Sequence, residues 1–267
     1  MRFRLTILGC GSSGGVPRVG QGWGACDPAE PRNRRRRCSV LLERETEAGK
    51  TTVLVDTSPD LREQLIDQKV TRLDAILMTH AHADHLHGLD DIRPLTMIMR
   101  RLIPMYMDGP TGRDIREKFG YILETPPGSP YPPLVEPHRL TPGVTVTIDG
   151  AGGPIDALPV LFRHGDIDAL GFRFDDTLYS PDLSDVPAES IGALEDLDLW
   201  IIDALRYTPH PTHITVARAL ELIAEYRCRR AVLTNLHTDI DFATLSSKVP
   251  GNVSLAYDGL TLELTRR

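Results

Sequence analysis

The sequence predicts an α/β fold in which two β-sheets pack face to face and helices cover their outer sides. Three observations support this. Short apolar runs with strand character recur along the chain, helical patterns fall between them, and each half runs from strands to a helix and then repeats that order. With 267 residues, 41% of them hydrophobic, the chain can bury a substantial core. We expect a single domain over residues 1–267.

In the first half, alternating apolar residues predict a strand at Phe3–Leu8, which ends at a Gly-rich turn. The polar segment 44–50 is expected to join a hairpin, and Pro59 is expected to open an amphipathic helix. The continuous apolar character of Asp74–Thr79 indicates a strand buried on both faces. Further strands are expected at residues 39–43, 51–56 and 103–107, and helices at 60–68, 86–92 and 112–123.

Residues 93–142 are interpreted as an excursion within the domain, because their proline-rich part, Pro126–Pro142, is not expected to form regular structure. The second half then resumes the pattern. Its best helix is expected at Ile214–Tyr226, where one apolar stripe recurs at helical spacing. The last strand pair, Val253–Leu264, is expected to turn at Asp258-Gly259. The other expected elements are strands at residues 144–148, 155–162, 170–174, 177–180, 199–202 and 230–234 and a short helix at 242–248.

Composition limits the classes of partner. The net charge of −7 argues against a dedicated nucleic-acid surface, so no stable nucleic-acid partner is expected. The basic run Arg32–Arg37 is the local exception, either a solvated loop or a patch for an anion. The four cysteines form no CxxC pair, and no apolar run approaches the ~20 residues that span a bilayer. A soluble, cytoplasmic protein without membrane attachment is therefore expected, and it could form a homodimer.

The run Thr79-His80-Ala81-His82-Ala83-Asp84-His85 is the most informative segment of the chain. Three imidazoles and a carboxylate follow a buried strand, which is a rigid place to hold a cation. In an extended segment, His80 and His82 project to the same side. Asp84 and His85 are adjacent and, in an irregular turn, could face a second ion.

Three later residues also follow expected strands, namely His164, Asp182 and His237. Strand ends at one sheet edge can converge, so these side chains are expected to complete the site. Asp185 is the alternative carboxylate to Asp182. A bridging Asp182 would suit two cations about 3.5–4 Å apart, which lower the pKa of a bridging water and hold a phosphoryl oxygen. Nitrogen and oxygen ligands favour zinc or manganese.

The His80-x-His82-x-Asp84-His85 pattern resembles the signature of the metallo-β-lactamase fold, a four-layer αββα sandwich. Three further motifs resemble one branch of that superfamily. They are Gly9-x-Gly11-Ser12-Ser13-Gly14-Gly15-Val16-Pro17, Tyr179-x-x-Asp182 and Asp203-Ala204-Leu205-Arg206. The branch contains the phosphoribosyl cyclic phosphodiesterase of carbon–phosphorus lyase metabolism and is similar to the tRNA 3′-end processing endonuclease.

The resemblance implies a role for each matching position. One metal would be held by His80, His82 and His164, and the other by Asp84, His85 and His237, with Asp182 bridging them. Asp84 would thereby serve catalysis as well as binding.

The same resemblance implies that Asp56 orients ligands and that His213 faces the substrate phosphate, although His213 could instead cap the helix that follows it. The relatives also carry a structural zinc held by cysteines in the loop after the Gly-rich turn. Here that loop offers only Cys26, and Ile240 stands three residues past His237, so no structural zinc is expected and residues 18–37 must be held otherwise.

The expected function is a dinuclear phosphodiesterase acting on a small phosphodiester or nucleotide, cyclic ribose phosphates included. A metal-bridging hydroxide would attack phosphorus, and His213 would stabilise the transition state or protonate the leaving alkoxide. Two alternatives stay open: a tRNA 3′-end processing type of nuclease, and a non-catalytic binding or carrier module of the same fold.

Overall fold

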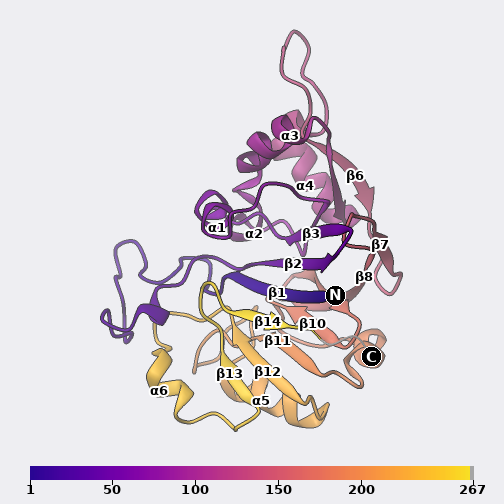
Figure 1. The fold of residues 1–267 in the computed structure, drawn as a ribbon. Coiled ribbons are helices and arrows are strands. Elements are labelled where there is room, and N and C mark those ends of the chain that lie inside the picture. Colours follow the sequence, from indigo (N-terminus) through magenta and orange to yellow (C-terminus); the bar gives the residue numbers. More distant parts are fainter. Residues whose placement is uncertain (265–267) are drawn as a thin grey trace.

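The computed structural model describes residues 1–264, which fold into two seven-stranded sheets packed face to face (Figure 1). The first sheet has the order β14-β1-β2-β3-β4-β5-β6 and the second the order β13-β12-β11-β10-β9-β8-β7. The strands of the first sheet are β1 (Arg2–Gly9), β2 (Ser39–Thr46), β3 (Gly49–Val55), β4 (Ala75–Leu77), β5 (Ile103–Met107), β6 (Val135–Arg139) and β14 (Thr261–Glu263). Those of the second are β7 (Val146–Ile148), β8 (Ile155–His164), β9 (Ile167–Phe174), β10 (Thr177–Ser180), β11 (Leu199–Asp203), β12 (Arg230–Thr234) and β13 (Val253–Leu255).

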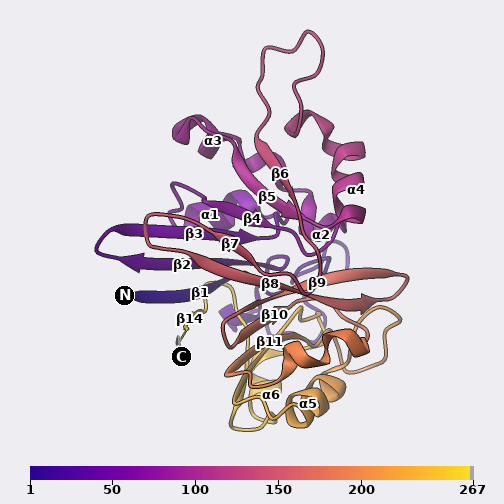
Figure 2. The same cartoon turned by 90° about the vertical axis from the view of Figure 1, so that its right-hand side faces the viewer.

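Helices form the two outer layers (Figure 2). One group lies outside the first sheet and consists of α1 (Leu61–Asp67), α2 (Ala83–Leu86), α3 (Arg93–Met99) and α4 (Gly109–Phe119). The other lies outside the second sheet and consists of α5 (Val216–Glu225) and α6 (Phe242–Ser246). Short 3₁₀ segments occur at Pro31–Asn33, Leu89–Ile92, Gly120–Ile122 and Ala188–Leu194. The four-layer αββα prediction is confirmed.

Three apolar clusters hold these layers together. The inward faces of both sheets form the central cluster, in which Leu5, Val55 and Ile201 are fully buried. A second cluster joins the first sheet to its helices, and a third joins the second sheet to α5 and α6. In the third, the apolar stripe of α5 contributes Ala219, Leu222 and other residues that are nearly inaccessible to solvent. Because every sheet face is covered, both sheets are rigid supports for the residues at their ends.

The expectation of no regular structure over Pro126–Pro142 is wrong at its C-terminal end. Residues Val135–Arg139 form β6, which pairs in parallel with β5 and places Pro137 opposite Met105. A proline is tolerated there because β6 is the edge strand, so its missing N–H removes no bond to a further strand. The segment that precedes β6 projects from the molecule as a long loop (Figures 1 and 2).

The expected final strand pair is also wrong, because β13 and β14 belong to different sheets. β13 pairs in parallel with β12, whereas β14 pairs antiparallel with β1. The turn at Asp258-Gly259 lies between them, with Gly259 at φ 92°, and the amide of Gly259 donates to the carbonyl of Ile7. The turn therefore carries the chain from one sheet to the other.

Three smaller expectations differ from the structure. The hairpin of β2 and β3 turns at residues 47–48, so most of the expected loop 44–50 continues the two strands. Asp84 and His85 lie in the helical turn α2, where an irregular turn was expected. No helix was expected at α3, whose residues fall in the excursion of residues 93–142; Pro94 lies in its first turn, where proline is tolerated.

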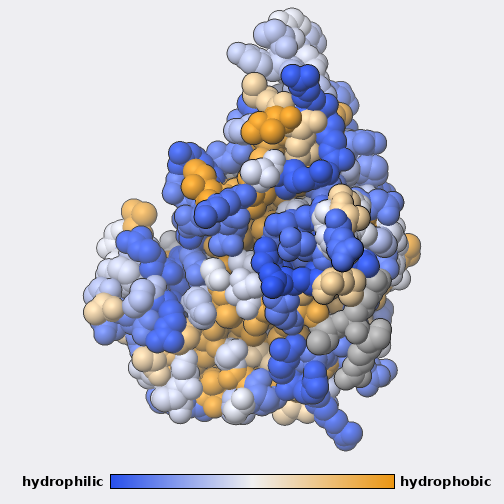
Figure 3. Space-filling model, viewed as in Figure 1, coloured by the Kyte–Doolittle hydropathy of each residue, from blue (hydrophilic) through white to orange (hydrophobic). Residues whose placement is uncertain are grey.

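The outer surface over α1 and α3 carries apolar side chains, seen as orange patches in Figure 3. They include Ile66, Met97 and Ile98, whose exposed fractions are 54%, 71% and 70%. Within the described residues, no helix has the length and apolar character that a membrane crossing requires.

Candidate metal centre

The predicted ligands meet where strands of both sheets end. His80 follows β4, and His164 is the last residue of β8. Asp182 and His237 come shortly after β10 and β12, which belong to the parallel part of the second sheet. A hydrogen bond from the Leu170 amide to the Thr79 carbonyl, 2.9 Å long, ties the two sheets together beside the cluster.

Four of these side chains form a compact group. The ligand atoms of His80, His82, His164 and Asp182 all lie within 4.8 Å of one another. Asp182 is central, because its Oδ2 lies 3.5 Å from Nε2 of both His80 and His164. His82, the exposed member of the group, places Nδ1 3.2 Å from Nε2 of His164.

Hydrogen bonds to the far ring nitrogens aim two of the imidazoles inward. Nδ1 of His164 lies 2.7 Å from the Thr212 carbonyl, which can only accept, so this nitrogen carries the proton and Nε2 keeps its lone pair. Thr79 donates its hydroxyl proton to Asp56, so its Oγ1 accepts from Nδ1 of His80 at 3.0 Å. Both Nε2 atoms therefore face the cluster as acceptors.

The donor set fits a divalent cation. Nε2 of His80 and Nε2 of His85 are buried and have no hydrogen-bond partner among the described residues. Burial, reinforced by neighbouring imidazoles, lowers the pKa of His80 well below its usual value, which favours the neutral form that binds metal. Buried nitrogens without a partner are costly, and bound cations would satisfy both.

Asp182 stays ionised despite its burial. Desolvation favours the neutral acid, but the attraction of His85 and other imidazoles outweighs it and holds the pKa of Asp182 well below its usual range. Asp182 also accepts a hydrogen bond at Oδ1 from Nδ2 of Asn235, at 3.1 Å. Its second oxygen, Oδ2, is left to face the imidazoles.

A buried carboxylate, Asp56, supports the cluster from behind. Its Oδ2 accepts from Nδ1 of His85 at 2.7 Å, and its two oxygens also accept from the amide and the hydroxyl of Thr79, each at 2.8 Å. Asp56 has a φ of 64°, a left-handed conformation that is uncommon for a residue with a side chain. Asp56 therefore orients His85 directly and orients His80 through Thr79.

Of the remaining predicted ligands, His85 and Asp84 lie beside Asp182, and His237 follows β12 at the same end of the second sheet. Nε2 of His85 is 3.4 Å from Oδ2 of Asp182 and 3.6 Å from Oδ2 of Asp84. His237 is fixed at this end of the sheet by its amide, which donates to the Leu205 carbonyl. Its Nε2 lies 2.8 Å from Nη1 of Arg18, a contact that sequence reasoning did not predict.

His213 also reaches the centre. Its ring stacks edge-on against His164 with centroids 4.7 Å apart, and its Nδ1 lies 2.9 Å from Oδ2 of the buried Asp203. Burial favours the neutral ring, but the attraction and hydrogen bond of Asp203 outweigh it and raise the pKa of His213 to about 9. His213 is thus held as a proton donor beside the cluster.

Asn235 is a residue of the site that sequence reasoning missed. It has a φ of 60°, and its Nδ2 lies within hydrogen-bond distance of the Pro181 carbonyl, Oδ1 of Asp182 and Oδ1 of Asp203. Asparagine tolerates this conformation better than most residues, which fits its place after β12. An asparagine two residues before a predicted ligand was the available signal, but nothing in the sequence indicated its partners.

The loop of residues 18–37 is held by polar contacts with the segment 237–242. The Cys26 thiol donates to the carbonyls of Thr238 and Ile240, and Nη1 of the buried Arg35 lies 3.3 Å from the His237 carbonyl. Nδ2 of Asn33, fully buried, donates to Oδ2 of Asp241 at 2.7 Å. These contacts fix the loop next to His237.

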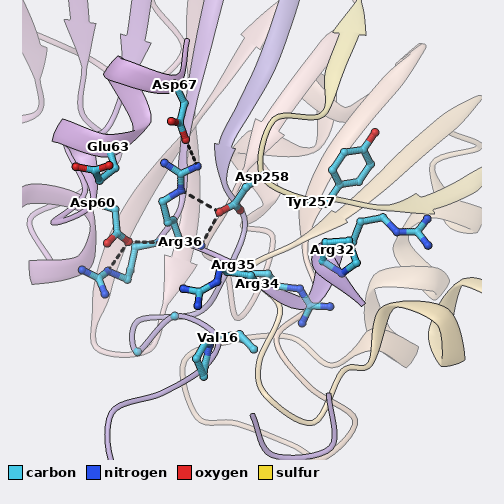
Figure 4. Close-up of a pocket in the computed structure, with 15 residues that line it drawn as sticks. Val16, Arg32, Arg34, Arg35, Arg36, Asp60, Glu63, Asp67, Tyr257 and Asp258 are labelled. Atoms are coloured by element: carbon cyan, nitrogen blue, oxygen red, sulfur yellow. Dashed lines mark hydrogen bonds and ion pairs between the residues drawn. The ribbon is translucent and has the colours of Figure 1, made fainter. Parts of the chain in front are cut away.

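The arginine run lines a cavity of about 580 Å³, with Asp60, Asp67 and Asp258 among its other lining residues (Figure 4). Its cations are largely paired. Arg36 contacts Asp67 at 2.6 Å and Asp258 at 3.2 Å, and Arg37 contacts Asp60 at 2.9 Å. Ion pairs thus hold part of the run against the domain, whereas the exposed Arg34 has no carboxylate partner among the described residues. Both expectations for this run, a solvated loop and a patch for an anion, stay predictions.

A second groove, of about 590 Å³, opens beside the cluster and has His80 in its wall. The tip of the β8–β9 hairpin and the N-terminal turn of α4 form its other sides, with Ile167 and Thr111 among the lining residues. Its size suits a small organic phosphate.

Comparison with known proteins identifies several relatives of this chain. A family model described as the beta-lactamase superfamily domain matches residues 51–235. Octanoyltransferase from Porphyromonas gingivalis is 32% identical over 263 residues, which cover 97% of this chain and 51% of that protein. Ribonuclease Z from Bradyrhizobium diazoefficiens is 34% identical over 131 residues, covering 48% of this chain and 42% of that protein. The chain thus matches about half the length of these relatives.

Two solved structures are similar over nearly the whole chain. The crystal structure of a new diphosphatase from the PhnP family has a TM-score of 0.88 at 34% identity, and the match covers 99% of this chain and 98% of that one. The Zn²⁺-bound structure of PqqB from Methylobacterium extorquens has a TM-score of 0.76 at 17% identity, covering 98% and 100%, which is a likeness of fold alone.

Proposed function

Because the chain belongs to the β-lactamase superfamily and carries a His/Asp cluster suited to a divalent metal, we propose that it is a dinuclear metal-dependent phosphodiesterase. The observation that carries the proposal is the convergence of His80, His82, His164 and Asp182 within 4.8 Å. His85, Asp84 and His237 would complete a second site, with Asp182 between the two. The preferred metals are zinc and manganese.

The proposed substrate is a small phosphodiester or nucleotide, with cyclic ribose phosphates and diphosphates as the first candidates. Two features support this choice. The groove beside His80, about 590 Å³, can hold a ligand of that size. The similar structure at 34% identity is described as a diphosphatase of the PhnP family.

Two bound cations would supply a water of lowered pKa and would neutralise the non-bridging oxygens of the phosphoryl group. The chain's own residues would orient the metal ligands and supply a proton. Asp56 would hold His85 in position through Nδ1, and Asn235 would hold Asp182 through Oδ1. His213, kept protonated by Asp203, would donate a proton from Nε2 to the departing alkoxide oxygen.

The test is a substrate panel run with Mn²⁺ and with Zn²⁺. It includes cyclic nucleotides, cyclic ribose phosphates, dinucleoside diphosphates and a chromogenic phosphodiester. Turnover of at least one small phosphodiester or diphosphate, abolished by chelator and restored by metal, is the expected result. A metal-loaded protein that turns over none of them would contradict the proposal.

A tRNA 3′-end processing activity is the second candidate, and the match to ribonuclease Z favours it. It predicts cleavage of structured RNA precursors with no turnover of small phosphodiesters. The net charge of −7 weighs against it, because an RNA-binding surface normally needs a basic excess. Including a precursor RNA in the same panel separates the two activities, and the absence of any bound metal would favour the non-catalytic carrier alternative.

The cytoplasmic location and a homodimer are kept as predictions. Fractionation of cells that express the tagged chain tests the first, and light scattering of the purified protein tests the second.

A further inference from the structure

The Arg18 guanidinium has no carboxylate partner among residues 1–264, and it contacts the side chain of a predicted metal ligand. Its Nη1 lies 2.8 Å from Nε2 of His237, and its Nη2 lies 3.4 Å from Oγ of Ser13. Arg34 and Arg35 of the same loop also lack a carboxylate partner in this range, but Arg34 lies over the Trp23 ring and Arg35 donates to the His237 carbonyl and to Asn33. Arg36 and Arg37, by contrast, each form ion pairs with aspartates. A cation without a counter-ion among the described residues therefore stands against His237, a predicted metal ligand.

Contacts within the loop hold the Arg18 side chain in this position. The backbone of Arg18 exchanges two hydrogen bonds with Gly22, each 2.8 Å long, which fixes the start of the side chain. A Cβ on Gly14 would lie 2.3 Å from Nε of Arg18, so a side chain there would force the guanidinium to shift from the position in which it contacts His237. The loop itself is held by Arg35 and Asn33.

Arg18 and a metal cation need the same lone pair. Nδ1 of His237 lies 2.6 Å from Oδ1 of Asp239, a carboxylate acceptor, so the ring proton sits on Nδ1. Nε2 then has one lone pair, which an N–H of Arg18 occupies, since arginine can only donate. A cation bound at His237 therefore releases the guanidinium.

We propose that Arg18 is the phosphate-binding residue of this site, and that it leaves His237 for the anionic substrate when a divalent cation takes Nε2. The inference rests on the proposed function. The released guanidinium retains only Ser13 as a partner and stands beside bound cations that repel it. A phosphoryl group placed between them removes this repulsion and accepts the paired N–H donors.

The experiment measures binding and does not depend on turnover. Three proteins are compared by calorimetric titration: the wild type, Arg18→Met and Arg18→Lys. Each is first stripped of metal with a chelator and titrated with Zn²⁺. The zinc-loaded protein is then titrated with orthophosphate. For Arg18→Met we expect orthophosphate to bind about tenfold more weakly or worse, because a charge-assisted pair is lost. We also expect the last zinc equivalent to bind more tightly, because its competitor is gone. Arg18→Lys should bind phosphate with intermediate affinity.

Two further variants make the result decisive. Gly14→Ala keeps the guanidinium but displaces it from His237, so it should tighten zinc binding as Arg18→Met does. Arg32→Met, on the same loop, removes a cation already paired with Glu30 and should leave both affinities unchanged. A phosphate affinity in Arg18→Met within about threefold of wild type, or zinc binding that weakens in both Arg18→Met and Gly14→Ala, overturns the inference. If these binding results hold but no phosphoester is turned over, only the proposed function fails.

Discussion

The Nδ1 atom of His85 donates a 2.7 Å hydrogen bond to Oδ2 of Asp56, and both side chains are almost completely buried. This bond fixes the ring proton on Nδ1 and leaves Nε2 of His85, buried and unpartnered, facing Asp182 at 3.4 Å. A ligand nitrogen is therefore positioned by a carboxylate that does not itself enter the centre. The arrangement makes metal affinity depend on a residue behind the cluster.

Replacing Asp56 with Asn should weaken metal binding by about 10- to 100-fold, because the amide is a poorer acceptor for the His85 ring. Asparagine tolerates the φ of 64° at this position, so the backbone should be retained. Titration against a competing chromophoric chelator measures the effect. Asp175→Asn, at an exposed position with a φ of 52°, is the matched control and should bind metal like the wild type. An unchanged metal affinity in Asp56→Asn would show that Asp56 does not position His85 for metal binding.

Replacing His213 with Ala should lower kcat by roughly 10²–10⁴-fold while both metals stay bound, because general acid catalysis is lost and no proposed ligand is removed. Steady-state kinetics on the best substrate of the panel, together with elemental analysis, measures both quantities. His138, which lies outside the cluster, offers a control in His138→Ala. Wild-type turnover of a fully loaded His213→Ala protein would exclude the proposed role.

Replacing Asn33 with Ala should destabilise the folded protein by about 2–3 kcal/mol. The side chain is fully buried and donates to Asp241, and its Oδ1 accepts from the amide of Phe242 at 2.8 Å, so its loss leaves several polar groups unpaired. Urea unfolding measures the difference. Asn252→Ala, at an exposed turn, should cost no more than about 0.5 kcal/mol. Equal stability of the two variants would show that other contacts hold the loop of residues 18–37.

Asp258 should give the protein a pH-dependent stability. Burial raises the pKa of this carboxyl to about 6, even though Arg36 contacts it, whereas an unfolded chain should titrate near about 4. Between these values the folded state binds more protons than the unfolded state, so the contribution of Asp258 to stability falls as pH rises from about 4 to about 6.

Compared with Asp258→Asn, the wild-type protein should therefore lose at most about 3 kcal/mol of relative stability between pH 4 and pH 7. The asparagine still offers Oδ1 to the Arg36 amide. Urea unfolding of both proteins across this range measures the difference, in which the titration of all other groups cancels. A relative stability that is constant, or that rises with pH, would contradict this assignment.

The sequence predicted the fold well because the ligands and the strands were read from local patterns. Buried strands such as β4 are short apolar runs followed directly by polar residues, and His80 stands at such a point. Where pairing depends on distant partners, prediction failed. Nothing local indicates that β13 joins β12 whereas β14 joins β1, or that Pro137 lies in an edge strand.

The same limit applies to the candidate site. The histidines and Asp182 could be predicted because metal ligands follow recognisable spacings. Asn235 and Arg18 could not, because each acts through contacts with residues that are remote in the chain. The Arg18 contact with His237 spans 219 positions, and only the folded loop brings the two together.

The most direct test of the central claim is anomalous diffraction from crystals of protein purified without chelator, collected at the zinc and manganese edges. The account predicts two anomalous peaks about 3.5–4 Å apart. One should lie against His80, His82 and His164, the other against Asp84, His85 and His237, with Asp182 between them. Peaks located elsewhere in the molecule, or none in crystals soaked with either metal, would contradict it.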